Sequence, residues 1–184
     1  MQLWKFDSFI EAEQANHIEQ EMTTNDFPWY YLESSCADDA DFSKKNIIDS
    51  SIFFHLLFSE GKSSHYFDIV KPILDKINTT HLPIKKLIRI KANLTVPNIK
   101  RVNATNIDTH GPIHNDSTEK NNYSLLYYVN DSDGYTYFYE GEEIVLRKSP
   151  LKNKAVLFPS NTWHAGNTPF KTDKRIVINV VYQV

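Results

Sequence analysis

The sequence predicts a mainly β fold of the α+β class, a barrel or jelly roll with N-terminal helices packed outside. Its 184 residues include 11 Phe, 10 Tyr and 3 Trp, and aromatic side chains favour half-buried strands. Short segments of strand character are separated by turn signals through the second half, whereas the first half has helical spacing. We expect one domain over residues 1–184, because this length suits a single core.

Two helices are expected in the first half. Ser8 is a plausible N-cap with Glu11 completing a capping box, and the helix should end near Thr24. Its apolar residues recur at three- and four-residue spacing, namely Ala12, Ala15, Ile18 and Met22. Residues 64–79 have similar spacing, but Pro72 predicts a kink or a late start.

Strands are expected after Pro83. In 87–94, alternation places Arg89, Lys91 and Asn93 on one side and apolar residues on the other. The further predicted strands are 123–129, 135–139, 143–148, 155–158 and 175–184. An aromatic segment at 27–32 should run extended. The irregular loop 33–50, with Trp29 and Tyr30 before it, is a candidate substrate wall.

Composition narrows the class of protein. The net charge of −3 argues against a general nucleic-acid coat. The segment 83–107 is basic without any acid, and 131–143 is acidic; we interpret both as solvated. No apolar run approaches the roughly 20 residues of a membrane span, and no signal peptide is evident. Cys36 is the sole cysteine, so a reducing cytoplasm is expected, or a host cytoplasm if a phage encodes the chain.

The most informative segment is His110-Gly-Pro-Ile-His114-Asn-Asp116. In an extended chain, His114 and Asp116 project to the same face and can take adjacent positions on one metal. His164, after the predicted strand 155–158, can supply a third ligand. Two histidines and one carboxylate make the facial triad of non-haem Fe(II) oxygenases and leave other positions open.

Arg175 opens the last predicted strand and shares a face with Val177 and Asn179. A guanidinium behind the metal can bind the distal carboxylate of 2-oxoglutarate through two parallel hydrogen bonds. Taken singly, each of these side chains is more often an ordinary polar residue. Their order and spacing favour the joint interpretation.

Two rival interpretations use the same residues. His110 and His114 have the spacing of a zinc-protease helix, but Gly111 and Pro112 between them disfavour helix and no Glu follows His110. A cupin-like barrel that holds another metal stays open, and Arg175 argues against it only moderately.

With these residues the sequence resembles the 2-oxoglutarate/Fe(II)-dependent oxygenase superfamily, its prolyl-4-hydroxylase-like branch above all, and the small oxygenase-like proteins of phages and marine bacteria. Besides the site residues, the matching stretches are Phe27-Pro-Trp-Tyr-Tyr31, Ile88-Arg-Ile-Lys-Ala-Asn-Leu94, Leu126-Tyr-Tyr-Val-Asn-Asp-Ser-Asp-Gly134 and Ala155-Val-Leu-Phe158. The resemblance implies a double-stranded β-helix that uses Fe(II), 2-oxoglutarate and O2, with ascorbate in support.

The resemblance also implies roles for further residues. Tyr128 should hydrogen-bond the distal carboxylate of the cosubstrate, Asn93 should line the same pocket, and Asn179 should lie near the oxygen site. The usual Gly-Gly-Glu-Thr turn reads Asp133-Gly-Tyr-Thr136 here, so a prolyl substrate does not follow. His110 is either a contact near the site mouth or a loop histidine held by a turn.

The function expected is oxygenation of a peptide side chain or small molecule, with 2-oxoglutarate converted to succinate. Two alternatives stay open. One is oxidation of a nucleobase or nucleotide, suggested by the basic segment 83–107; the other is a non-catalytic metal-binding module. A homodimer is the default expectation.

Overall fold

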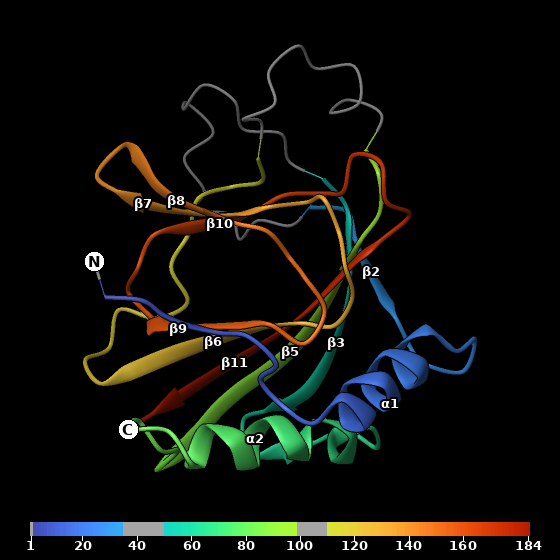
Figure 1. Cartoon of the computed structure of the whole chain (residues 1–184), viewed down its shortest axis with the longest axis horizontal. Coiled ribbons are helices and arrows are strands. Elements are labelled where there is room, and N and C mark those ends of the chain that lie inside the picture. The colour runs from blue at the N-terminus through green and yellow to red at the C-terminus, as the bar shows by residue number, and fades with distance from the viewer. Residues whose placement is uncertain (1, 35–49, 99–109) are drawn as a thin grey trace.

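The computed structural model describes residues 2–34, 50–98 and 110–184, and two antiparallel sheets face each other in it (Figure 1). The larger sheet has eight strands in the order β1-β9-β6-β11-β5-β3-β2, with β4 paired to β3. Its strands are β1 (Trp4–Phe6), β2 (Tyr30–Leu32), β3 (Ile52–Ser59), β4 (Lys62–Ser63), β5 (Lys86–Thr95), β6 (Asn122–Tyr128), β9 (Ala155–Pro159) and β11 (Arg175–Gln183).

The smaller sheet has three strands in the order β10-β7-β8. They are β7 (Thr136–Glu140), β8 (Glu143–Lys148) and β10 (His164–Gly166). Together the sheets form the predicted double-stranded β-helix. An isolated bridge joins His114 to His164, so the segment around His114 lies beside β10.

Helices cover the outer face of the larger sheet (Figure 1). Helix α1 spans Ala12–Thr23 and begins after Glu11, so the predicted N-cap at Ser8 is wrong. The reason is tertiary: the amides of Phe9 and Ile10 donate to the backbone and side-chain oxygens of Asn153, at 2.8 and 3.0 Å. Those amides need no helix cap, and Ser8 turns the chain with a positive φ of 51°.

Helix α2 spans Lys71–Asn78 and follows the 3-10 turn η1 (Phe67–Val70). The late start predicted from Pro72 is confirmed, because Pro72 occupies the first turn, where its missing N–H costs no intrahelical bond. Helices and sheet enclose a core in which Ile18 and Met22 of α1, with Ile73 and Ile77 of α2, meet the outward residues of the sheet.

Alternation along β11 separates this core from the space between the sheets. Ile176, Ile178 and Val180 belong to the helix-side core, whereas Val177 belongs to a second cluster with Phe138 of the smaller sheet. The odd-numbered side chains from Arg175 onward therefore face the inside of the jelly roll. Burying each such aliphatic side chain contributes about 1.5–3 kcal/mol.

The other predicted strands agree with the structure to within one or two residues at their ends. Strands β1, β3, β4 and β10 are not predicted by the sequence pattern. Strand β3 is the important omission, since it pairs with β5 and extends the inner face beside the candidate site. Among the described residues, no helix has the length and apolar character to cross a membrane.

Replacing Ile178 with Ala should destabilise the protein by about 2–5 kcal/mol, since a fully buried aliphatic side chain leaves a cavity in the helix-side core. Denaturant unfolding measures this loss. Val145→Ala is the matched control, because Val145 on β8 is exposed and its truncation should change stability by under about 0.5 kcal/mol. Equal losses for the two variants would contradict the assignment of the core.

Candidate metal centre

Three predicted ligands converge between the sheets. One ligand atom from each of His114, Asp116 and His164 lies within 4.8 Å of the other two. Backbone pairing explains this meeting. His114 and His164 exchange two N–H···O bonds of 2.9 Å, and the amide of Asp116 donates to the carbonyl oxygen of Ser160 at 2.9 Å. Residues far apart in sequence are thus set side by side by a short ladder.

Each histidine is oriented by a hydrogen bond behind it. Nδ1 of His114 lies 3.0 Å from the carbonyl oxygen of Pro112, and Nδ1 of His164 lies 3.0 Å from that of Thr162. Each Nδ1 must carry the proton in order to donate to a carbonyl, which leaves Nε2 with a free lone pair. This arrangement is usual for histidines that bind metals.

His164 is electrostatically prepared to be a ligand. It is buried, and the rings of Phe138 and Phe158 lie 6.1 and 5.0 Å from its own. Burial, followed by repulsion from His114, lowers the pKa of His164 to about 4. The imidazole is therefore neutral at physiological pH, and no proton needs to be displaced before Nε2 binds a cation.

The carboxylate of Asp116 divides its two oxygens between different tasks. Oδ1 accepts hydrogen bonds of 2.9 Å from Nη2 of Arg89 and from Nδ2 of Asn179. Oδ2 is buried, has no hydrogen-bond partner and lies 3.8 Å from Nε2 of His164. Burial raises the pKa of Asp116, but attraction to His164, His114 and Arg89 outweighs it, so the pKa is lowered. An ionised oxygen thus faces the two imidazoles.

The interpretation of the basic strand residues as a solvated face is wrong for Arg89 and Lys91. In the sheet, Arg89 lies opposite Val181 and Lys91 lies opposite Asn179, on the inner face of β5. Arg89 forms an ion pair with Asp116, and the ammonium of Lys91 lies 5.2 Å from the centre of the Phe54 ring. The alternation of side chains along this strand predicts which residues share a face, but it does not predict which face points into the barrel.

Arg175 forms a second polar cluster, as its place at the start of β11 predicts. It is only 6% exposed, and its Nη2 donates to Oγ1 of Thr136 at 2.9 Å. The hydroxyl of Tyr128 donates to the same oxygen at 3.0 Å. Thr136 is thus the residue that sequence reasoning missed, although it lies in the turn that departs from the family pattern.

Glycines shape the space around this guanidinium. A Cβ on Gly166 would lie 3.5 Å from Nη1 of Arg175, and one on Gly134 would lie 2.9 Å from its Cδ and 2.6 Å from the carbonyl oxygen of Asn167. Gly134 therefore allows a close approach of backbone to side chain that no other residue permits.

Buried polar atoms without a hydrogen-bond partner lie between the triad and the Arg175 cluster, most of them on the inner face of β5 and β11, which we call the floor of the site. Among the described residues they include Oδ2 of Asp116, Oδ1 of Asn93, Oδ1 of Asn179, Oγ1 of Thr95 and Nε of Arg89. Such atoms are rare in folded proteins and call for a ligand, ion or water. Apart from Asp116, these residues lie on the inner face of β5 and β11, which suits a polar cosubstrate held beside a metal.

Two other expectations are settled by packing. His110 is buried, with Nδ1 2.7 Å from the carbonyl oxygen of Gly111 and Nε2 2.7 Å from the hydroxyl of Tyr139. Tyr139 and Phe138 point to opposite faces of β7, so His110 packs on the outer face of the smaller sheet and is a structural residue. Trp29 donates to the carbonyl oxygen of Met22 at 3.2 Å and packs on the helix-side core, while residues 35–49 of the expected substrate wall lie outside the described part of the chain.

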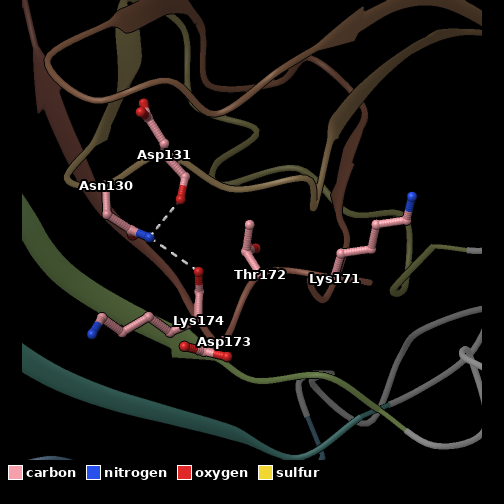
Figure 2. A pocket seen from close by; sticks show the side chains of 6 residues that line it. All are labelled: Asn130, Asp131, Lys171, Thr172, Asp173 and Lys174. Carbon is pink, nitrogen blue, oxygen red and sulfur yellow. Dashed lines mark hydrogen bonds between the residues drawn. The ribbon is translucent and has the colours of Figure 1, made fainter.

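A surface depression of about 290 Å³ lies elsewhere, between the loop after β6 and the residues before β11 (Figure 2). Nδ2 of Asn130 donates to the carbonyl oxygens of Asp131 and Lys174 at 2.9 and 3.0 Å. None of the triad or of the Arg175 cluster lines it. Its polar groups tie the loops together, so it is not the candidate site.

The donor set fits the metal that it predicts. Two imidazole nitrogens and one carboxylate oxygen suit Fe(II) and leave coordination positions for other ligands. A closed structural zinc site would have four protein ligands, and only three lie together in the part of the chain that the structure describes.

Comparisons with known proteins agree with this site. Residues 100–183 match the family model of the 2OG-Fe(II) oxygenase superfamily. A 2OG-Fe(II) oxygenase family oxidoreductase from Burkholderia pseudomallei has a similar structure, with a TM-score of 0.68 at 10% identity over 98% of this chain and 84% of that one. A search of curated protein sequences found no match.

Prolyl hydroxylases share the fold as well. The enzyme from Trichoplax adhaerens, solved with a hypoxia inducible factor peptide, matches with a TM-score of 0.63 at 13% identity over 98% of this chain and 83% of that one. The Pseudomonas putida prolyl-4-hydroxylase matches with a TM-score of 0.61 at 14% identity, over 98% and 91%. Residues 100–183 thus match the 2OG-Fe(II) oxygenase superfamily, and the chain has a fold similar to that of prolyl hydroxylases.

Changing Asp116 to Ala should weaken metal binding by at least 100-fold, of the order lost when an interaction in a metal site is removed. Calorimetric titration with Mn(II) measures the affinity without requiring turnover. His110→Ala is the control variant, because His110 lies on the outer face of the smaller sheet, and its metal affinity should be unchanged. Wild-type affinity in the Asp116 variant would refute the assignment.

Changing Gly134 to Ala should displace Arg175, because the added Cβ would overlap the carbonyl oxygen of Asn167 and crowd the arginine Cδ. We expect a loss of stability of about 1–3 kcal/mol together with weaker 2-oxoglutarate binding. Gly141→Ala is the matched control, since no atom lies within 4 Å of its added Cβ. Gly141 has a positive φ of 60°, so that variant should lose some stability but no cosubstrate affinity.

Proposed function

We propose that this protein oxygenates a C–H bond of a peptide side chain or small molecule while 2-oxoglutarate is decarboxylated to succinate. One observation carries the proposal. The ionised, unpartnered Oδ2 of Asp116 faces Nε2 of His164, while the buried guanidinium of Arg175 lies in a separate polar cluster on the same inner face. A bound metal would give Oδ2 of Asp116 a partner, and one carboxylate of a bound dicarboxylate would pair with Arg175.

Each predicted side chain has a task in this proposal. His114, Asp116 and His164 hold Fe(II), which when bound supplies the activation of dioxygen coupled to decarboxylation. Arg175 and Tyr128 bind the distal carboxylate of 2-oxoglutarate in place of some of their present bonds to Thr136. The buried amides of Asn93 and Asn179 line the space between these two ends.

The surrounding protein keeps the site dry and ordered. Phe138, Phe158 and Val177 pack together beside the triad, and their apolar surface excludes water that would compete for reactive positions. Arg89 and Asn179 hold Asp116 in one orientation. Preorganised groups of this kind lower the cost of reorganisation during the reaction.

Support for a peptide substrate comes from the Trichoplax enzyme, which was solved with a peptide. A prolyl substrate is not part of the proposal, because the turn Asp133-Gly-Tyr-Thr136 is built differently here. Asp133 accepts hydrogen bonds from the amides of Phe170 and Lys171, at 2.8 and 2.7 Å, and so ties two loops together.

Oxidation of a nucleobase or nucleotide was suggested by the basic segment 83–107. Arg89 of that segment is paired with Asp116 inside the barrel, so it is not a free cation for a phosphate group. The non-catalytic alternative does not account for a buried Arg175. The homodimer, the single domain, the cytoplasmic location and the likeness to phage and marine bacterial proteins stay predictions.

The deciding experiment is an anaerobic titration with Fe(II) and 2-oxoglutarate, followed by admission of air. We expect a weak visible charge-transfer band from the chelate, and then succinate formation supported by ascorbate. Binding without any succinate, with or without candidate substrates, would favour a non-catalytic module. Absence of the band would overturn the proposal at the cosubstrate step.

Changing Arg175 to Ala should raise the 2-oxoglutarate requirement strongly while leaving metal binding largely intact. Loss of a buried charge pair costs about 2–5 kcal/mol, which corresponds to roughly 30-fold or more in KM. Steady-state succinate formation and Mn(II) titration measure the two effects separately. Normal turnover at low 2-oxoglutarate would show that another residue is the anchor.

A further inference from the structure

Three cationic side chains are found on the inner face of β5 and β11 among the described residues: Arg89, Lys91 and Arg175. Arg175 lies opposite Thr95, whereas Lys91 lies opposite Asn179. Four residues along a strand span about 13 Å, so Arg175 and Lys91 stand toward opposite ends of this floor. One dicarboxylate anchored at Arg175 and chelating the metal does not account for the cation at Lys91.

Lys91 differs from Arg89 in having no partner of opposite charge among the described residues. Arg89 is paired with Asp116, and Arg175 belongs to the cosubstrate cluster. No described acidic side chain lies within ion-pair distance of Lys91, whose ammonium lies 5.2 Å from the centre of the Phe54 ring. Burial, followed by repulsion from Arg89, lowers the pKa of Lys91.

The charge balance of the loaded site leaves this ammonium unmatched. A divalent metal and the dianion 2-oxoglutarate cancel each other, and Arg89 and Asp116 cancel each other. Of the described residues on this face, Arg175 and Lys91 remain as cations. Arg175 holds the end of the cosubstrate, so Lys91 is the group left to attract a further anion from solution.

Apolar side chains lie beside Lys91 on the same face. Leu56 of β3 is directly opposite Lys91, and Phe54 is opposite Asn93. Tyr30 of the edge strand β2 is in turn opposite Phe54, with ring centres 6.0 Å apart. Tyr30 is 56% exposed and Leu56 is 40% exposed, so this surface is accessible to a ligand and continuous with the ammonium.

We infer that the substrate carries a carboxylate that pairs with Lys91, next to an apolar or aromatic group that packs on Phe54 and Tyr30. The inference rests on the proposed function and names its substrate class. A single ammonium suits a monoanion. A phosphate ester, with nearly two negative charges, commonly binds where several donors converge.

The neighbouring Asn179 explains why this position serves specificity. Asn179 lies opposite Lys91 and donates to the metal-binding carboxylate of Asp116. A carboxylate held at Lys91 would therefore place the adjoining part of the substrate beside the metal. The anion fixes the register of the substrate, and the aromatic contact contributes affinity.

The test uses two matched peptides, acetyl-Glu-Phe-amide and acetyl-Gln-Phe-amide, which differ only in the charge of one side chain. Their binding to the full chain loaded with Mn(II) and 2-oxoglutarate is measured by calorimetry or ligand-observed NMR. We expect the acidic peptide to bind at least 10-fold more tightly. Lys91→Gln should abolish this difference, and Lys91→Arg should retain most of it.

Lys86→Gln is the matched control, because Lys86 lies on the same strand but is exposed at its far end; it should retain the preference. 3-Phenylpropionate and its neutral amide form a second pair, which shows whether a small acid suffices without a peptide backbone. Binding of either acid with the same dependence on Lys91 supports the inference.

Several results would overturn the inference while leaving the proposed function intact. Equal binding of the acidic and neutral peptides is one. A raised 2-oxoglutarate requirement in Lys91→Gln is another, since it would assign Lys91 to the cosubstrate. Binding of adenosine 5′-monophosphate in preference to both acids is a third. Failure of the proposed function itself would appear earlier, as the absence of 2-oxoglutarate binding before any peptide is added.

Discussion

The candidate site depends on the short backbone ladder between His114 and His164. Two reciprocal N–H···O bonds of 2.9 Å set these residues side by side, and the Asp116 amide continues the contact to Ser160. No single ligand side chain creates this meeting. Without the ladder, the segment holding two ligands would not be registered against β10, and three ligand atoms could not converge.

Burial and nearby charges then set the protonation states of His164 and Asp116. Burial lowers the pKa of His164, while attraction to His164, His114 and Arg89 lowers the pKa of Asp116 despite its burial. The division of the carboxylate is the main consequence: one oxygen is saturated by Arg89 and Asn179, and the other has no partner. An unpaired buried oxygen destabilises the protein, and a bound cation removes that cost.

The large sheet separates stability from function through the alternation of its side chains. The even-numbered residues of β11 pack against the helices, and its odd-numbered residues face the site. The same strand therefore anchors the core and carries Arg175 and Asn179. Substitutions on the two faces should accordingly be separable, with stability lost on one and ligand binding lost on the other.

Sequence alone determined the residues whose chemistry depends on type and local spacing. His114 and Asp116 share a side because extended chains alternate, and the position of Arg175 at the start of a strand predicted its approach to the site. The tertiary structure decided which side chains face the site, because a local sequence pattern does not specify this. The inward direction of Arg89 and Lys91, the bridging role of Thr136 and the outward packing of His110 depend on which face of a strand meets which sheet. A period-two pattern sorts side chains into two sets, but only long-range pairing decides which set is buried.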